Sequence, residues 1–261
     1  MSYTNHAFLD INVHAVNIND VLESTTESIK TGSKSIISNH NLHSLYLIHF
    51  SEKRGLIKEF YKKSNVVLAD GMSIILLGKL FGHKSLSFEH RNTYLDIIHP
   101  LLNHYNEQCL SLFYLGSTPE ASKVTQKFLN DNYPKIRVTT NDGFFDASND
   151  SIGNRDIVDK INSKSPNILM VGMGMPRQEI WVVENINDLN VNVVMNCGAC
   201  FDYLIGFIAT PPRWMGKIGL EWFFRLLDEP TRLYKRYLYE PFKLIPLIII
   251  YMVKKLLDKN V

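Results

Sequence analysis

The sequence has few of the features that mark secreted, membrane-spanning or disulfide-stapled proteins. Its three cysteines, Cys109, Cys197 and Cys200, cannot form a disulfide framework, because one thiol must stay unpaired. The longest apolar run, residues 244–253, is far shorter than the stretch of about 20 residues that a membrane-spanning helix needs. The first residues lack the basic and apolar stretches of a secretion signal. Together these absences predict a cytoplasmic protein.

Charge of one sign is also missing, because 28 Lys and Arg stand against 26 Asp and Glu, a formal net charge of +2. That balance argues against a dedicated nucleic-acid-binding protein. It is uneven along the chain, since residues 203–261 hold ten Lys or Arg and only five Asp or Glu. A basic C-terminal segment on a mildly acidic remainder predicts one anionic partner surface.

Apolar strands alternate with helical patterns from about residue 8 to residue 206, which predicts an α/β fold with a mostly parallel sheet and helices on both faces. Residues 8–16 are expected to form one strand. The helix after it has Asn17 or Asn19 as its cap and Gly32 as its end. Within the 261 residues this gives one body, residues 1–206, and a separate C-terminal segment, residues 207–261.

Several polar residues and glycines fall at or just after the ends of predicted strands. Ligands of parallel sheets bind beyond the carboxyl ends of the strands, so these positions are candidates for a site. Ser117 also has capping-box spacing to Glu120 at the start of the next helix. The strand-end positions are Asp70, Ser117, Gly174, Asn196 and Asp202.

Gly172 and Gly174 follow one strand and invite a nicotinamide-dinucleotide assignment. The pattern G-x-G-x-x-G is broken, however, because Arg177 stands at the third glycine position. The glycine pair still allows backbone N–H groups to approach an anion at a helix N-terminus. We therefore predict phosphate or nucleotide contact at Gly174, Arg177 and Gln178, with a plain turn between strand and helix as the alternative.

Asp70 ends an apolar strand and precedes Gly71, which places it at the ligand-binding edge of the sheet. A carboxylate there can act as a general base. From these features alone, an Asp that caps the following helix is an equal alternative.

The sequence offers no recognisable metal or cofactor motif. Cys197 and Cys200 match C-x-x-C, but no second cysteine or histidine pair completes a zinc site, and we expect both to be structural. No two aspartates are spaced D-x-D, the pattern that presents two carboxylates to a nucleotide-bound divalent metal. We expect no metal and no cofactor.

The segment after residue 206 is helical, aromatic and basic. Arginines interleaved with tryptophan, phenylalanine and tyrosine suit a phosphate-bearing membrane interface. The alternative is that the segment packs on the body or seals an interface between two copies. Pro246 is expected to interrupt any helix that begins near residue 241.

These pieces together resemble the WecG/TagA/CpsF glycosyltransferases, glycosyltransferase family 26. The resemblance spans roughly residues 10–240, and its last block is long and specific. It implies a Rossmann-like fold, a basic appendage that docks on the membrane, and inverting transfer of a sugar from a UDP-sugar to a sugar on undecaprenyl diphosphate. The four blocks are VVLADGM, LGSTPEASKVTQKF, VGMGMPRQEIWV and FDYLIGFIATPPRWMGKIGLEWFFRLLDEPTRLYKRY.

The resemblance also implies roles for single residues. Asp70 matches the proposed catalytic base and Asn41 a pocket asparagine, whereas Asn39 stands where the family usually has threonine. A second departure is Tyr94, which replaces a glycine and, with Asn39, puts the exact substrates in doubt. The remaining matches, all read as substrate-binding, are Arg91, Gln178, Arg213, Arg225 and Arg232.

The resulting hypothesis is a glycosyltransferase of bacterial surface-polysaccharide or teichoic-acid precursor synthesis, peripheral on the inner face of the cell membrane. Its partners would be a UDP-sugar, a polyprenyl-diphosphate-linked sugar and an anionic membrane. N-acetylmannosamine, its uronic acid, glucose, galactose and glucuronic acid all remain open as the donor sugar, and homo-oligomerisation is open too. The rival functions are a non-catalytic membrane scaffold of a polysaccharide assembly complex and a nicotinamide-dependent oxidoreductase.

Overall fold

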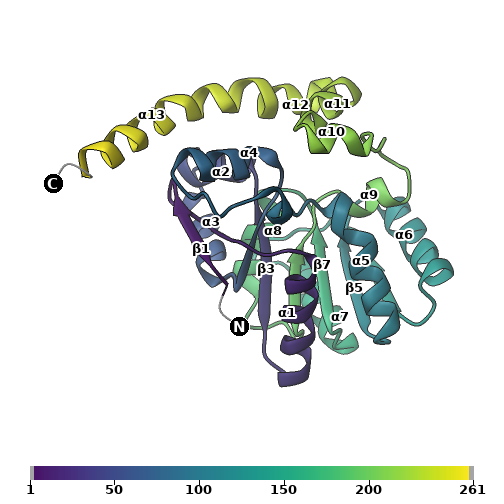
Figure 1. Cartoon of the computed structure of the whole chain (residues 1–261). Helices are drawn as coiled ribbons and strands as arrows, with labels where there is room; N and C mark the ends of the chain where they lie inside the picture. Colours follow the sequence, from purple (N-terminus) through teal and green to yellow (C-terminus); the bar gives the residue numbers. More distant parts are fainter. Residues whose placement is uncertain (1–2, 259–261) are drawn as a thin grey trace.

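Six parallel strands form the sheet that organises the protein, in the order β4–β3–β8–β7–β5–β6 (Figure 1). The computed structural model describes residues 3–258. All of these strands except β6 are buried along their whole length or all but their first residue, as expected for a parallel sheet covered on both faces. The strands are β3 (Ser35–His40), β4 (Val66–Ala69), β5 (Ser111–Gly116), β6 (Arg137–Asn141), β7 (Ile168–Gly172) and β8 (Val193–Asn196).

Helices cover both faces of the sheet, which confirms the predicted α/β class. One apolar cluster joins the sheet to α1 (Ile18–Thr31), α5 (Tyr94–Glu107) and α6 (Pro119–Asn132). A second cluster joins the other face to α3 (Arg54–Lys63), α7 (Ile152–Lys164) and α8 (Arg177–Asn185). Shorter elements complete the body: α2 (Leu42–Phe50), α4 (Met72–Leu80), η1 (Phe88–His90) and α9 (Cys200–Leu204).

The single strand predicted for residues 8–16 is wrong. The chain forms an antiparallel hairpin of β1 (Asn5–Phe8) and β2 (Ile11–His14), which is separate from the main sheet. Leu9 and Asp10 form its two-residue turn with φ of 53° and 57°. Positive φ at both central residues is typical of a tight hairpin, but leucine gives no sequence signal for it.

The predicted start and end of α1 are confirmed. The Asn17 side chain accepts hydrogen bonds from the backbone of Asn19 and Asp20, and Gly32 ends the helix with φ of 67°. The capping box predicted at Ser117 is wrong, because Thr118 caps α6 and its side chain accepts from Ala121 N. Ser117 instead has φ of 58°, and its side chain donates to Asp202 rather than capping the helix.

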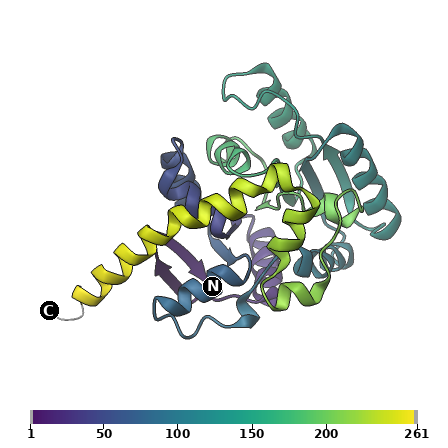
Figure 2. The ribbon, with the colours of Figure 1, turned by 90° about the horizontal axis from the view of Figure 1, so that it is seen from above.

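Four further helices follow the body and lie over the carboxyl edge of the sheet (Figure 1). The last of them runs diagonally across the body and past its edge (Figure 2). Among residues 3–258, no helix is long and apolar enough to cross a bilayer. The elements are α10 (Arg213–Lys217), α11 (Glu221–Asp228), α12 (Pro230–Tyr234), a π-helical turn η2 (Lys235–Tyr239) and α13 (Glu240–Asp258).

Pro246 does not interrupt this last helix, contrary to the sequence expectation. Helix α13 passes through it without a break. Pro246 lies on the exposed side, whereas Leu244, Leu247 and Ile248 pack against α2 and α4. That burial holds the helix together although one backbone hydrogen bond is lost.

Helix α13 is apolar on both its faces. Its first residue, Glu240, contacts His43 of α2 through Oε2 and Nδ1 at 2.7 Å, which ties the helix to the body. The face turned away from the body carries large exposed side chains: Phe242, Ile245, Ile249, Ile250, Val253, Leu256 and Leu257. We call these seven residues the outer face of α13. The division into body and appendage stays a prediction, and residues 1–2 and 259–261 lie outside the described residues.

Candidate active site

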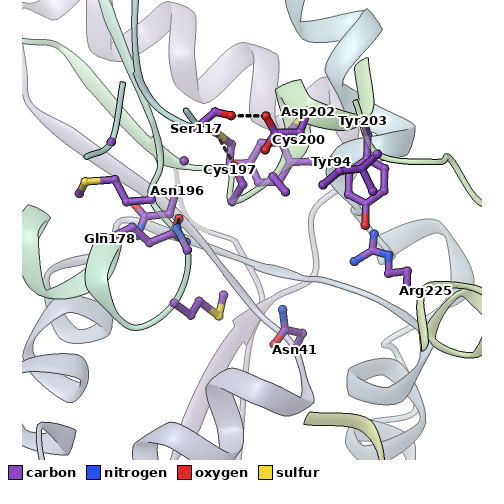
Figure 3. A pocket seen from close by; sticks show the side chains of 18 of the residues that line it. Asn41, Tyr94, Ser117, Gln178, Asn196, Cys197, Cys200, Asp202, Tyr203 and Arg225 are labelled. Carbon is purple, nitrogen blue, oxygen red and sulfur yellow. Dashed lines mark hydrogen bonds between the residues drawn. The ribbon is translucent and has the colours of Figure 1, made fainter. Parts of the chain in front are cut away.

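Two cavities lie at the carboxyl edge of the sheet, under the C-terminal helices. The first, of about 390 Å³, lies over the ends of β5, β7 and β8, and Figure 3 shows it from close by. The second, of about 350 Å³, lies between the end of β4 and helices α10 and α11. Five residues line both cavities and therefore form a shared wall: Asn41, Asp70, Arg225, Arg236 and Tyr237.

Asp70 is held in this wall by two asparagine side chains. It follows β4, and its backbone N–H donates to His40 O in the neighbouring strand β3 at 2.8 Å. Asn39 Nδ2 and Asn41 Nδ2 both donate to Asp70 Oδ2, at 2.9 and 3.1 Å. No hydrogen bond to Oδ1 is made within the described part of the chain. The two amides thus fix the carboxylate and leave one oxygen for a ligand.

The orientation of the Asn41 amide follows from its place at the start of α2. Asn41 Oδ1 accepts from Ser44 N at 3.1 Å, in the usual manner of a helix cap. The amide nitrogen must then point the other way, toward Asp70. A residue that caps a helix therefore also positions the candidate base.

The turn between β7 and α8 forms part of the floor of the first cavity. Gly174, with φ of 79°, lines it, and its N–H donates to Gln178 Oε1 at 3.2 Å. Arg177 also lines the cavity, but its Nη2 donates to Phe145 O at 2.6 Å and its guanidinium lies 5.4 Å from the centre of the Phe145 ring. The three residues predicted to contact phosphate thus share one turn.

Two predicted arginines of the C-terminal helices reach the first cavity. Arg225 lies over the Tyr203 ring at 4.9 Å, and its buried Nε has no hydrogen-bond partner among residues 3–258 (Figure 3). Arg232 is exposed and pairs with Glu229, Nε to Oε1 at 2.8 Å. Although Pro230 separates α11 from α12, Arg225, Arg232 and Arg236 converge on one cavity. An unpartnered arginine donor in a polar cavity favours an anionic ligand.

Arg91 and Arg213 have a different place. Arg213 lines neither cavity and pairs with Asp96 and with Glu221, 3.5 Å from its Nη1. Arg91 lines the second cavity, and its Nη2 contacts Asp96 Oδ2 at 2.5 Å. The two arginines thus join η1 and α5 of the body to α10 and α11. Their role as substrate-binding residues stays a prediction.

Four polar residues in and beneath the floor were assigned no specific role from the sequence. Ser117 Oγ donates to Asp202, an interaction drawn in Figure 3, and burial raises the pKa of Asp202. Glu179 lies beneath the floor, fully buried, and accepts from Gln178 Nε2 and Asn196 Nδ2. The position of Ser117, Asn196 and Asp202 at strand ends was a signal for them. Glu179, on helix α8, gave no such signal.

Cys197 and Cys200 also line the first cavity but lie buried in the apolar cluster behind it. Burial raises the pKa of both thiols, so neither is an activated nucleophile. All three cysteines are free. Among the described residues no group of three or more His, Cys, Asp or Glu is arranged to hold a metal ion.

Comparison with known proteins identifies the family of the chain. Residues 6–258 match the model of the glycosyl transferase WecG/TagA/CpsF family. Proteins of Staphylococcus aureus strains MRSA252 and NCTC 8325 are each 25% identical over 209 residues, 78% of this chain and 73% of theirs. Both are named N-acetylglucosaminyldiphosphoundecaprenol N-acetyl-beta-D-mannosaminyltransferase. A match over nearly the whole chain supports neither the oxidoreductase nor the scaffold alternative. The chain belongs to the WecG/TagA/CpsF family and is a glycosyltransferase.

Proposed function

We propose that the protein transfers a sugar from a UDP-sugar to N-acetylglucosamine on undecaprenyl diphosphate, with inversion at the anomeric carbon. N-acetylmannosamine is the first candidate donor sugar, because the Staphylococcus aureus relatives are named for that transfer. Another hexose is the alternative. The product would be a lipid-linked precursor of a bacterial surface polysaccharide or teichoic acid.

The observation that carries this proposal is the position of Asp70 between two cavities. A glycosyltransferase that works by single displacement needs a base that reaches the acceptor hydroxyl while the donor lies on the other side of the bond being formed. Asp70 lines both cavities, and its Oδ1 makes no hydrogen bond within residues 3–258. One carboxylate in a shared wall can serve both substrates.

The first cavity has the chemistry of a donor site. Backbone turns at the ends of β5, β7 and β8 approach each other closely there, and an ideal Cβ on Gly116 would lie 2.6 Å from Gly172 O. Such glycine turns expose N–H groups to a diphosphate. Arg225, Arg232 and Arg236 line the opposite side and supply positive charge. A UDP-sugar carries two negative phosphates, which this arrangement complements.

The second cavity has the chemistry of an amphiphilic acceptor site. Met72, Trp222 and Pro241 give it an apolar side, and Arg91 and Arg225 give it cations near Asp70. A polyprenyl-diphosphate sugar has the same polarity, with a polar head and an apolar tail. We place the sugar at Asp70, the diphosphate at the arginines and the first prenyl units against Trp222.

The chemistry then follows from the charges that develop. The acceptor hydroxyl gives its proton to Asp70 Oδ1 as its oxygen attacks the anomeric carbon. The bond from that carbon to the UDP oxygen breaks, and UDP leaves with its electron pair and an added negative charge. Arg225 and the N-terminal end of α8, which follows the Gly172–Gly174 turn, stabilise that charge.

The outer face of α13 is our candidate for membrane docking. It places seven large apolar side chains away from the body, and Lys243 and Lys254 lie on the same helix. A helix of this kind lies in the plane of an anionic membrane, where each basic residue contributes about 1 kcal/mol. Docking on the cytoplasmic face would bring the second cavity to its lipid-linked acceptor. An interface between two copies is the alternative.

The test is a panel of UDP-sugars with a short-chain polyprenyl-diphosphate N-acetylglucosamine, in buffer with and without EDTA. We expect release of UDP and an inverted disaccharide product with at least one N-acetylhexosamine donor, and equal rates with EDTA. No transfer with any donor would contradict the substrate classes. An absolute Mg²⁺ or Mn²⁺ requirement would contradict stabilisation of the leaving group by the chain's own arginines.

A further inference from the structure

A buried carboxylate, that of Glu179, lies on α8 beneath the first cavity. Its residue is 2% exposed, and no ion pair to it is formed within the described residues. Burial raises the pKa of Glu179, while the hydrogen bonds from Gln178 and Asn196 and, to a smaller extent, the charge of Arg236 lower it. A buried carboxyl group without a paired cation is costly and persists only where its hydrogen bonds are needed.

Both hydrogen bonds of Glu179 end on one oxygen and come from residues next to two different turns. Gln178 Nε2 donates to Glu179 Oε1 at 2.8 Å, and Asn196 Nδ2 donates to the same atom at 3.1 Å. Gln178 is the second residue of α8, after the β7–α8 turn, and Asn196 is the last residue of β8, before the β8–α9 turn. The other oxygen, Oε2, is buried without a partner in residues 3–258.

The two turns that Glu179 joins touch directly. An ideal Cβ on Gly172 would lie 2.6 Å from Gly198 O, so a side chain cannot fit between them. Both turns line the first cavity, through Gly172 and Gly174 on one side and Gly198 on the other. Any loosening of one turn therefore changes the position of the other.

Glu179 also fixes which end of each amide points where. Because Gln178 Nε2 is bound to Glu179, Gln178 Oε1 is the atom that accepts from Gly174 N at 3.2 Å. Without the carboxylate, the Gln178 amide is free to turn over and present Nε2 to the Gly174 N–H, which would repel it. The backbone of Gly174 would then lose its tie to α8.

We propose that Glu179 is a positioning residue of the donor site, whose buried carboxyl oxygen clamps the β7–α8 and β8–α9 turns in the geometry that binds the diphosphate of the nucleotide sugar. The inference rests on the proposed UDP-sugar donor. Glu179 touches no substrate and acts through Gln178 and Asn196. A neutral oxygen at the Oε1 position serves equally well, because both amides need only an acceptor there.

The test compares Glu179→Leu with Glu179→Gln, with Glu184→Gln on the same helix as the matched control. Leucine fills the space but accepts no hydrogen bond, whereas glutamine keeps the acceptor. We expect Glu179→Leu to weaken UDP binding by about tenfold or more in calorimetry and to raise the KM for the donor likewise. The KM for the acceptor should stay within about twofold, as should all constants of both glutamine variants.

A swap covers the case in which Glu179→Leu fails to fold. Asn196→Asp places a second carboxylate against Glu179 and should weaken UDP binding. Glu179→Gln added to Asn196→Asp should restore it, because the amide introduced at position 179 can donate to the carboxylate introduced at position 196 and accept from Gln178. Restoration supports the clamp, and its failure overturns it.

Besides failure of the swap, three results would overturn the proposal. Folded Glu179→Leu could bind UDP like the wild type, or it could weaken donor and acceptor equally, which would indicate general loosening of the fold. Wild-type protein that binds no UDP would overturn the proposed donor and this inference together. The first two results leave the proposed function standing.

Discussion

The floor of the first cavity and the helices that cover it are built in opposite ways. The floor is formed by turns at the ends of parallel strands. There the buried amides of Gln178 and Asn196 donate hydrogen bonds to the Glu179 carboxylate, and glycines allow two backbone turns to touch. The covering helices turn arginines inward and large apolar side chains outward. One region is held by specific hydrogen bonds, whereas the other exposes an apolar surface.

We propose that this difference separates binding of the donor from access of the acceptor. On this proposal the hydrogen-bonded floor binds the donor without a membrane. Charged groups connect the helices α10–α13 to the body. Among these connections are the Arg91–Asp96–Arg213–Glu221 network, the His43–Glu240 contact and the hydrogen bond from Lys255 Nζ to Phe81 O. Asp70 lies where the two regions meet. Changes to the floor should therefore affect UDP, and changes to the outer surface should affect the lipid.

The largest effect is expected from Asp70→Asn, which keeps the size of the side chain and removes its basicity. Loss of a general base typically costs about 10²–10⁴-fold in rate, so kcat should fall by that factor. UDP affinity should change by no more than about twofold, because the diphosphate contacts are elsewhere. Steady-state kinetics measures kcat and calorimetry measures UDP affinity. Asp131→Asn, at an exposed aspartate of α6, is the control. Near wild-type turnover by a folded Asp70→Asn variant would show that another group takes the proton.

The next largest effect is expected from Arg225→Ala. This change removes a guanidinium whose Nε has no hydrogen-bond partner in residues 3–258. Loss of one donor to a developing negative charge costs roughly 10²-fold in kcat. Arg225→Lys should recover only part of it, since an ammonium cannot replace the planar fork. Arg155→Ala, at an exposed arginine of α7, is the control. Full activity of Arg225→Lys would mean that charge alone suffices at this wall.

The outer face of α13 is tested by a triple change to serine at Ile245, Ile249 and Val253. These side chains are about half exposed, at 48%, 54% and 49%, so the fold should tolerate the change. We expect binding to anionic vesicles to fall by at least about tenfold in co-sedimentation. The control changes Val124 and Ile152 of the body to serine. Unchanged vesicle binding with an altered oligomeric state would assign this face to a second copy of the chain.

The smallest effect is expected from Trp222→Ala in the second cavity. Loss of one aromatic contact should raise the KM for a long-chain acceptor about three- to tenfold, with UDP affinity unchanged. Trp214→Ala is the matched control, because Trp214 is 59% exposed and lines neither cavity. A short acceptor without prenyl units should not distinguish the two variants. If it does, Trp222 contacts the sugar rather than the lipid.

The sequence predicted those parts of the fold whose signals are local. Examples are the apolar strands that end in glycine turns, the Asn17 cap and the Gly32 end of α1. Each signal lies within a few consecutive residues, and the structure has these features as expected. The strand pattern also placed Asp70 at the ligand-binding edge of the sheet, whereas Asn41 was identified only through the resemblance to the family. The structure adds that both asparagines bind the same carboxylate oxygen.

Other features depend on contacts between distant residues and gave no local signal. The turn at Leu9 and Asp10 places a leucine at positive φ, which leucine rarely adopts. Helix α13 tolerates Pro246 because its inner face is buried on the body. Arg213 had the same appearance in the sequence as Arg225, yet Asp96, more than a hundred residues away, holds it outside both cavities. Contacts between residues far apart in the sequence therefore determine the position of Arg213 and the continuity of α13.

The most direct test of the account is a structure of the Asp70→Asn protein with a UDP-sugar and a short-chain lipid-linked acceptor. The account predicts UDP in the first cavity, with its diphosphate between the Gly172–Gly174 turn and Arg225. It predicts the acceptor sugar in the second cavity, with its attacking hydroxyl at the side-chain position of residue 70. Both substrates in one cavity, or residue 70 out of reach of the acceptor hydroxyl, would contradict the assignment of Asp70 as the base between two sites.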